Sequence, residues 1–242
     1  METMHTAALV TGASRGLGAA MARALAAQGT RVALVARGQE ELERTVAAIR
    51  AAGGEVHPIV ADVGDKRAAH AIAAAAMALV GPLDLLVHNA STLGNVPLRP
   101  LMDTDCEALG RALEVNVVGP LRLTKLVVAS MLLRGRGLVV QITSDASVNA
   151  YPSWGAYGVS KAALDHLGRV LGAELEGTGV RVLSVDPGEM NTRMHAEAIP
   201  DADTRSLLEP EIVAQRILQL MRRGGALANG ARVEAGAWGA FA

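Results

Sequence analysis

Short runs rich in Val, Leu and Ile alternate with longer helix-like stretches along this chain of 242 residues. Several runs are apolar at almost every position, which is typical of strands covered on both faces. Strands that alternate with helices are joined by right-handed crossovers. The pattern therefore predicts an α/β fold with a doubly wound, mostly parallel sheet of seven strands and helices on both faces. The expected strands are Ala7–Thr11, Arg31–Ala36, Glu55–Ala61, Leu83–Asn89, Gly137–Thr143, Val180–Asp186 and Ala231–Glu234.

No linker or change of composition divides the chain, so we expect one domain over residues 1–242. The stretch 189–209 is irregular and charged. Because ligands of open α/β sheets bind at the carboxyl ends of strands, we interpret it as a substrate lid, with an ordinary surface loop as the alternative. The expected helices are Leu17–Gln28, Glu40–Ala52, Lys66–Val80, Asp105–Arg134, Ala156–Glu176 and Pro210–Arg223.

Composition excludes several classes of function. The formal net charge is −1 with both signs mixed, so nothing indicates a nucleic-acid partner. A single cysteine, Cys106, allows no disulfide framework or cysteine-based metal site, and we expect it to be a small buried hydrophobe. The most apolar run, Ala71–Val80, is shorter than the roughly 20 residues that cross a bilayer. We predict a cytoplasmic protein with no metal and no membrane partner.

The first predicted strand leads into Thr11-Gly12-Ala13-Ser14-Arg15-Gly16-Leu17-Gly18, and a helix follows at once. Glycines let the backbone turn tightly and approach a pyrophosphate, whose charge is favoured at a helix N-terminus. The spacing is G-x-x-x-G-x-G, which differs from the standard G-x-G-x-x-G. We interpret this turn as a dinucleotide site, with a turn that binds nothing as the alternative.

This turn and the later motifs resemble the short-chain dehydrogenase/reductase family over nearly the whole chain. Asp62-Val63 matches the pair that contacts adenine in that family, and Pro187-Gly188 with Thr192 matches its P-G-x-x-x-T. The resemblance implies a Rossmann-type fold and a nicotinamide cofactor. The residues it implies for the cofactor are Gly12, Ser14, Arg15, Gly16, Leu17, Gly18, Arg37, Asp62, Val63, Asn89, Ala90, Tyr157, Lys161, Pro187, Gly188 and Thr192.

One motif departs from the family. His88-Asn89-Ala90-Ser91 stands where the family usually has N-N-A-G. If the family's glycine needs a positive φ, Ser91 is strained there. We interpret His88, at the end of a strand, as a packed and hydrogen-bonded residue and not as a ligand.

The end of the second strand predicts the cofactor. NAD sites usually place an acid there to bind the ribose 2′-hydroxyl, whereas this strand ends Val35-Ala36-Arg37. Arg15 in the glycine turn is a second cation near the same place. Two charge-assisted contacts, each of about 1.5–3 kcal/mol, favour a 2′-phosphate, so we predict NADP(H). The alternative is that both arginines are solvated surface groups.

Tyr157 and Lys161 are four residues apart, so on a helix they share a face. We expect the ammonium to lower the tyrosine pKa by about 1–3 units, which would ready the phenol for proton transfer. A tyrosine and a lysine at this spacing are common in proteins. It is the family resemblance that supports a catalytic role for this pair. The resemblance implies that Ser144 holds the substrate oxygen, with Ser147 as the competitor, and that Asn116 supports the lysine through a water.

These motifs together predict an oxidoreductase that reduces a ketone or aldehyde with NADPH, Tyr157 being the general acid/base. The alternatives are a non-catalytic NADP(H) sensor on the same fold, or an epimerase or dehydratase. Residues 89–96, 154–165 and 186–192 are faintly similar to sepiapterin reductase and bacterial diketone reductases. The resemblance also implies a homodimer or homotetramer built on the two longest helices. The expected substrate pocket comprises Thr92, Leu93, Ser144, Ala146, Tyr151, Trp154, Tyr157, Met190 and Met194.

Overall fold

The computed structural model describes residues 5–223 and 226–236, so residues 1–4, 224–225 and 237–242 of the predicted domain lie outside the described residues. Seven strands form one sheet in the order β3-β2-β1-β4-β5-β6-β7. All six neighbouring pairs are parallel, which confirms the predicted doubly wound sheet. The strands are β1 (Ala7–Thr11), β2 (Arg31–Ala36), β3 (Val56–Val60), β4 (Leu85–His88), β5 (Gly137–Ile142), β6 (Val180–Asp186) and β7 (Ala231–Glu234).

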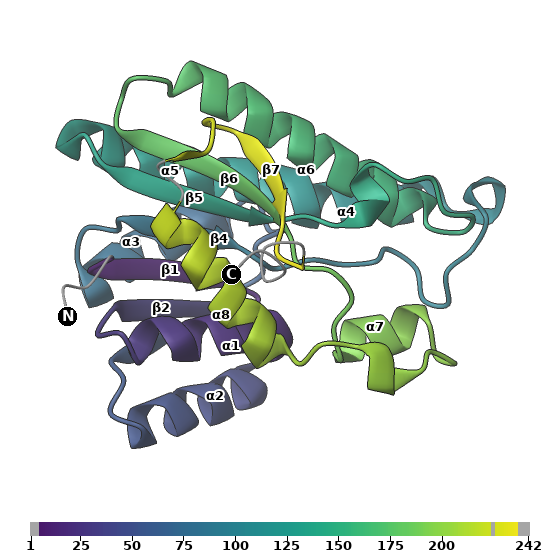
Figure 1. The fold of residues 1–242 in the computed structure, drawn as a ribbon, viewed down its shortest axis with the longest axis horizontal. Helices are drawn as coiled ribbons and strands as arrows, with labels where there is room; N and C mark the ends of the chain where they lie inside the picture. Colours follow the sequence, from purple (N-terminus) through teal and green to yellow (C-terminus); the bar gives the residue numbers. More distant parts are fainter. Residues whose placement is uncertain (1–4, 224–225, 237–242) are drawn as a thin grey trace.

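Helices cover both faces of the sheet (Figure 1). On one face lie α1 (Gly16–Ala26), α2 (Gln39–Ala51) and α8 (Pro210–Arg223). On the other lie α3 (Ala68–Val80), α5 (Gly119–Arg134) and α6 (Gly155–Glu174).

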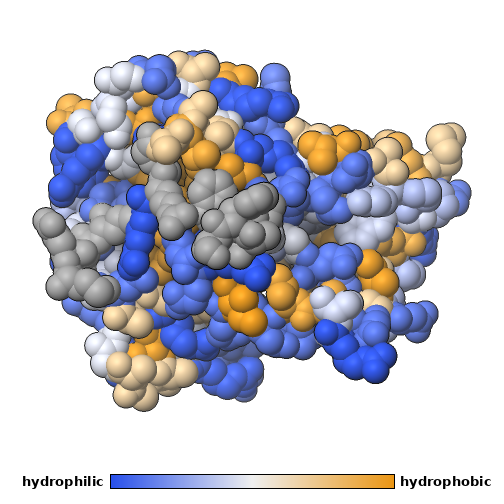
Figure 2. All heavy atoms as spheres, in the orientation of Figure 1, coloured by the Kyte–Doolittle hydropathy of each residue, from blue (hydrophilic) through white to orange (hydrophobic). Residues whose placement is uncertain are grey.

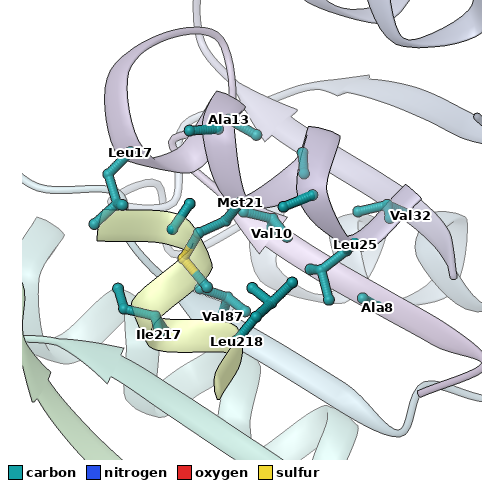
Figure 3. Packing of buried hydrophobic residues seen from close by; sticks show 14 of the residues in the cluster. Ala8, Val10, Ala13, Leu17, Met21, Leu25, Val32, Val87, Ile217 and Leu218 are labelled. Atoms are coloured by element: carbon teal, nitrogen blue, oxygen red, sulfur yellow. The ribbon is translucent and has the colours of Figure 1, made fainter. Parts of the chain in front are cut away.

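The period of two along β1 decides which side chains enter which layer. Ala8 and Val10 belong to the first apolar cluster, whereas Ala7 and Leu9 belong to the second. Figure 3 shows the first layer, where Met21 of α1 packs against α8 above the sheet. The core is therefore two apolar layers separated by a sheet that is buried on both faces.

The helix predicted over Asp105–Arg134 is interrupted, so that prediction was wrong in detail. The segment consists of α4 (Cys106–Leu113), a π-helical turn η2 (Glu114–Val118) and then α5. Pro120 has no N–H, so it cannot make the ordinary α-helical bond to the carbonyl four residues earlier. Gly119 allows the close approach, because a Cβ there would lie 2.4 Å from the Val63 carbonyl oxygen.

Cys106, at the start of α4, is exposed, which contradicts the expectation of a buried hydrophobe. The stretch Cys106–Arg134 is long and apolar enough to cross a membrane by length and composition, but half of its most apolar window is buried in the fold. Burial of that kind is expected of a core helix. The face drawn in Figure 2 mixes hydrophilic and hydrophobic residues, as is usual for a folded domain in water.

The segment 189–209 is more regular than the sequence indicated. It contains α7 (Arg193–Ala198) and a short turn η4 (Thr204–Ser206). Its two ends are joined, because Met190 and Leu208 form a parallel bridge. The segment follows β6 and projects beside the main body (Figure 1), which is compatible with the predicted lid.

Candidate active site

The turn between β1 and α1 has the geometry of an anion cradle. Gly12 and Gly16 have φ of 67° and 53°, values that favour glycine. A Cβ on Gly18 would lie 2.3 Å from the Gly12 carbonyl oxygen. The first turn of α1 contains no acid, and the N-cap residue Arg15 makes no side-chain capping bond. The N-terminal N–H groups are therefore free to bind an anion.

Asn89 and Thr11 hold this turn in shape. The Thr11 hydroxyl donates to the Val87 carbonyl at 3.2 Å and accepts from the N–H groups of Asn89 and Ala90, each at 3.1 Å. The Asn89 amide donates to the carbonyls of Thr11 and Gly12 at 3.0 and 3.1 Å. The Asn89 side chain, which directly follows strand β4, therefore supports the turn with these two hydrogen bonds.

A cavity of about 840 Å³ lies along the carboxyl ends of the central strands, as expected for a doubly wound sheet. Of the predicted cofactor residues, Gly18 and Gly188 do not line it. Gly18 lies behind the turn against Gly12 and Asn89. Those that line the cavity are Gly12, Ser14, Arg15, Gly16, Leu17, Arg37, Asp62, Val63, Asn89, Ala90, Tyr157, Lys161, Pro187 and Thr192.

Both predicted arginines line this cavity, and so does an acid that was not predicted, Glu41, which pairs with Arg15. Arg15 and Arg37 are exposed. The Arg15 Nη1 lies 3.2 and 3.0 Å from the two carboxylate oxygens of Glu41 in α2. Arg193 of α7 approaches the same carboxylate at 3.8 Å. The signal for Glu41 was available in the sequence, because an acidic first helical turn directly follows Arg37.

Asp62 lies on the same side of the cavity. Its carboxylate accepts from the Gly64 N–H at 2.8 Å and pairs with Arg111 at 2.5 Å. Burial alone would raise the pKa of Asp62, but the Gly64 hydrogen bond and the Arg111 guanidinium outweigh it and lower that pKa. Asp62 is therefore a fixed anion that shapes this side of the cavity.

Tyr157 and Lys161 both lie on the buried face of α6. The ammonium lies 5.4 Å from the tyrosine ring centroid and donates to the Ile142 carbonyl at 2.7 Å. Burial lowers the pKa of Lys161 to about 8, against the opposing attraction of Asp165 and Asp186. The two side chains thus converge as the four-residue spacing predicted.

The expected lowering of the Tyr157 pKa is wrong. Burial raises the pKa of the phenol above its ordinary value of 10.0. The neighbouring Ser144 hydroxyl lowers this pKa, and the negative charges of Asp186 and Asp145 raise it further. Burial prevails because the phenolate, if formed, would lose its hydration, and Lys161 is directed toward Ile142.

Ser144 follows β5 and caps the short turn η3 (Asp145–Ser147). Its hydroxyl accepts from the Ala146 N–H at 3.2 Å and donates to the Asp145 carboxylate at 3.0 Å. The competitor Ser147 is engaged elsewhere, because its hydroxyl donates to Asp165 at 2.5 Å. Ser144, and not Ser147, is therefore the serine that faces the tyrosine.

Comparison with known proteins shows the family to which the chain belongs. A profile of the short chain dehydrogenase family matches residues 6–203. The chain belongs to the short-chain dehydrogenase/reductase family. A short chain dehydrogenase of Pseudocercospora fijiensis is 38% identical over 206 residues, which cover 84% of this chain and 66% of that relative.

The solved structures similar to this chain include some that contain nicotinamide cofactors. A metagenomic short-chain oxidoreductase in complex with NADP is 32% identical, with a TM-score of 0.76 over 89% of both chains. A 7α-hydroxysteroid dehydrogenase, solved with NADH and 7-oxo glycochenodeoxycholic acid, is 27% identical, with a TM-score of 0.86 over 95% of this chain and 92% of that chain. This chain therefore resembles members of the family that bind either cofactor.

The residues of this short-chain dehydrogenase/reductase fit a dinucleotide of that kind. The glycine cradle and the open helix N-terminus can hold a pyrophosphate, and Lys161 lines the same cavity as the cradle. The loop at Pro187-Gly188 closes one side, where Gly188 has a φ of 73°. Thr192, at the start of α7, comes within 3.5 Å of a Cβ built on Gly16, so the segment 189–209 passes directly over the cradle.

Asn116 does not contact Lys161 through its side chain. The amide oxygen accepts from the Thr92 N–H at 2.9 Å and from the Ser91 hydroxyl at 3.2 Å. The amide nitrogen donates to the Thr92 carbonyl at 2.9 Å and to the Ser160 hydroxyl at 2.8 Å. The side chain thus ties the loop after β4 to α6. Its support of the lysine through a water stays a prediction.

The two departures from the family motif are both accommodated. Ser91 does not have a positive φ, so the expected strain is not present. His88 is fully buried and its Nε2 lies 2.8 Å from the Thr124 hydroxyl. Burial lowers the pKa of His88 to about 3, which keeps the ring neutral. Its interpretation as a packed, hydrogen-bonded residue agrees with this geometry.

The predicted substrate residues are partly brought together. Ala146 and Tyr157 form a small apolar cluster with Leu93, and Trp154 and Met194 pack against it. Tyr151, Trp154 and Tyr157 form an edge-to-face series with ring centroids 6.5 and 5.8 Å apart. Thr92 and Met190 line the large cavity. Leu98 and Ala198 also pack against the cluster and were missed, because no local motif marks them.

Proposed function

We propose that this protein reduces a ketone or aldehyde to an alcohol with NADPH. The observation that supports this most directly is the buried Tyr157–Lys161 pair on the same cavity as the glycine cradle. Ser144 lies beside the pair, and its hydroxyl favours the ionised form of the phenol. An acid, a second donor and a cation thus converge where a carbonyl would receive a hydride.

The reduced nicotinamide, when bound, supplies the hydride to the carbonyl carbon. Ser144 turns its hydroxyl from Asp145 to the substrate oxygen and holds it beside Tyr157. Tyr157, which is protonated at neutral pH and whose pKa is raised further by burial, donates its proton to that oxygen. The Lys161 ammonium, held by the Ile142 carbonyl, stabilises the phenolate that remains.

The preference for NADPH rests on two cations and one missing acid. Ala36 ends β2 where an acid would bind the 2′-hydroxyl, and Arg37 follows it in the cavity wall. Arg15 is on the same cavity, paired with Glu41. A 2′-phosphate would compete with Glu41 for Arg15 and gain charge-assisted hydrogen bonds.

The substrate is proposed to have an apolar body. The cluster of Leu93, Ala146, Trp154 and Met194 beside Tyr157 offers aliphatic and aromatic surface. A related dehydrogenase was solved with a 7-oxo bile acid, a ketone on a largely apolar frame. Diketones, aryl ketones and long-chain aldehydes are the classes to examine first.

The test is the loss of reduced-nicotinamide absorbance with NADPH or NADH and a panel of such carbonyls. We expect turnover with NADPH to exceed that with NADH by tenfold or more in kcat/KM. Tyr157→Phe should lower kcat at least 1,000-fold while NADPH binding and thermal stability change little, because only the transferable proton is removed. Retained turnover in Tyr157→Phe would disprove the catalytic assignment, and equal use of NADH would disprove the cofactor preference.

A further inference from the structure

Arg232 of β7, a residue that no sequence motif marked, lies directly behind the catalytic serine. Its Nη2 donates to the Ser144 carbonyl at 3.3 Å and to the Asp186 carboxylate at 2.7 Å. Its Nε donates to the Asp165 carboxylate at 3.2 Å. One guanidinium therefore joins the loop after β5, the end of β6 and the middle of α6.

These charges are withdrawn from water. The side chains of Asp165, Asp186 and Arg232 are 4%, 7% and 17% exposed. Breaking such a pair costs far more than breaking a surface pair, because the remaining charge stays buried. Asp165 also accepts from the Ser147 hydroxyl, so the same carboxylate anchors the other end of the η3 turn.

The network faces the catalytic pair. Asp165 lies one helical turn after Lys161 on α6, and both it and Asp186 act on the Lys161 ammonium. Asp186 acts on the Tyr157 phenol as well, together with Asp145. Arg232 is the cation that balances the two buried carboxylates, and Glu234, exposed on β7, approaches its outer edge at 3.3 Å.

We propose that Arg232 is a positioning residue, which fixes the Ser144 backbone and balances the Asp165–Asp186 charges behind Tyr157 and Lys161. The expected effect of Arg232 on turnover rests on the proposed function, whereas its expected effect on Lys161 does not. A planar guanidinium can hold three acceptors on different elements in one fixed geometry, whereas an ammonium is a single point donor. Arginine and lysine at this position are therefore not equivalent.

The first experiment compares Arg232→Met and Arg232→Lys with a matched control. Arg181→Met serves as the control, because Arg181 lies at the opposite end of β6 from Asp186 and its guanidinium also donates to a main-chain carbonyl, that of Leu227. We expect Arg232→Met to lower kcat at least tenfold, with KM and the dissociation constant of NADPH changed by less than threefold. Arg232→Lys should have a kcat between that of Arg232→Met and that of the unsubstituted protein. A purely structural role predicts that both Met variants lose thermal stability and keep kcat per folded molecule, and that result would overturn the proposal.

The second experiment needs no turnover. The chain has three lysines, Lys66, Lys125 and Lys161, so their side-chain NMR signals after selective 13C labelling can be assigned by one Lys161→Arg variant. Without the Arg232 charge, the carboxylates of Asp165 and Asp186 would favour the charged form of Lys161 more strongly. We expect the Lys161 titration midpoint to rise by about 0.5–1 pH unit in Arg232→Met and to stay unchanged in Arg181→Met. An unmoved midpoint in Arg232→Met would overturn the proposal, whether or not a substrate had been found. If the unsubstituted protein turns over none of the carbonyls, that result would count against the proposed function and not against the role of Arg232.

Discussion

Burial acts in opposite directions on the two titratable groups of the candidate site. It disfavours the charged form of each, so the pKa of Tyr157 rises and the pKa of Lys161 falls to about 8. Near neutral pH the free protein therefore holds a neutral phenol beside an ammonium that is close to losing its proton. This is the protonation state that reduction of a carbonyl requires.

The pH dependence of reduction follows from these two shifts. As the pH rises through about 8, Lys161 loses its proton while Tyr157 keeps its own, so the cation that stabilises the phenolate is lost. We expect kcat/KM for carbonyl reduction to be level below pH 7 and to fall above about pH 8, with Lys161 as the group responsible. Lys161→Arg keeps its charge at every accessible pH, so its residual activity should show no such fall. The same fall in Lys161→Arg would assign it to another group.

Site residues could be predicted from the sequence wherever the motif requires one kind of side chain at a fixed separation along the chain. Tyr157, Lys161 and Ser144 are of this kind, and the structure brings them together. The direction of the Tyr157 pKa shift was not predictable, because it depends on how much water the surrounding elements exclude. Arg232 was equally hidden, since Ser144, Asp165 and Asp186, which it holds together, lie 46 to 88 residues away in the chain.

At the scale of elements, the end of β2 and the start of α2 form one cofactor-facing unit. Gly38 is the N-cap of α2, so Arg37 and Glu41 stand on either side of a helix start. Glu41 pairs with Arg15 and lies near Arg193 of α7. An anion that binds Arg15 must first displace this carboxylate.

Removal of the Glu41 charge should therefore favour the phosphorylated cofactor. We expect Glu41→Gln to lower the KM for NADPH by about 2–5-fold and to leave the KM for NADH nearly unchanged, the size expected of one exposed ion pair. The difference should shrink at 0.5 M salt, because screening weakens exposed charges. Glu40→Gln is the matched control, since Glu40 pairs only with Arg44 within α2 among the described residues. Equal changes for both cofactors would show that Glu41 does not act on the 2′-phosphate.

Element boundaries were predictable to the extent that they depend on local sequence. The apolar run of β1 and the glycines after the helices were sufficient, because burial on both faces leaves little choice of conformation. The break between α4 and α5 was not predicted, although Gly119-Pro120 was a readable signal. The need for Gly119 arises from the Val63 carbonyl, a contact between distant segments that periodicity does not contain.

At the scale of the whole molecule, α6 connects the site to the outer surface. Its inner face carries Tyr157, Lys161 and Asp165, whereas Val159 and Val170 on its outer face are 46% and 39% exposed. The two valines are eleven residues apart, three helical turns, so they lie in one stripe along α6, with the exposed His166 between them. A second copy of the chain that packs on this stripe would hold α6 in position from its outer face. It would thereby also stabilise the position of Tyr157 and Lys161 on the inner face.

The prediction that this protein is a homodimer or homotetramer can be tested on that stripe. We expect Val159→Glu combined with Val170→Glu to give a monomer by light scattering after gel filtration, because charges would be buried at the contact. Activity should then fall with the loss of α6 support, while the far-ultraviolet circular dichroism stays that of the folded chain. Leu79→Glu on α3, an exposed apolar residue on a different helix, is the control and should leave the assembly intact. If the double variant and the unsubstituted protein have the same mass in solution, α6 is not the contact, and its exposed valines are ordinary surface residues.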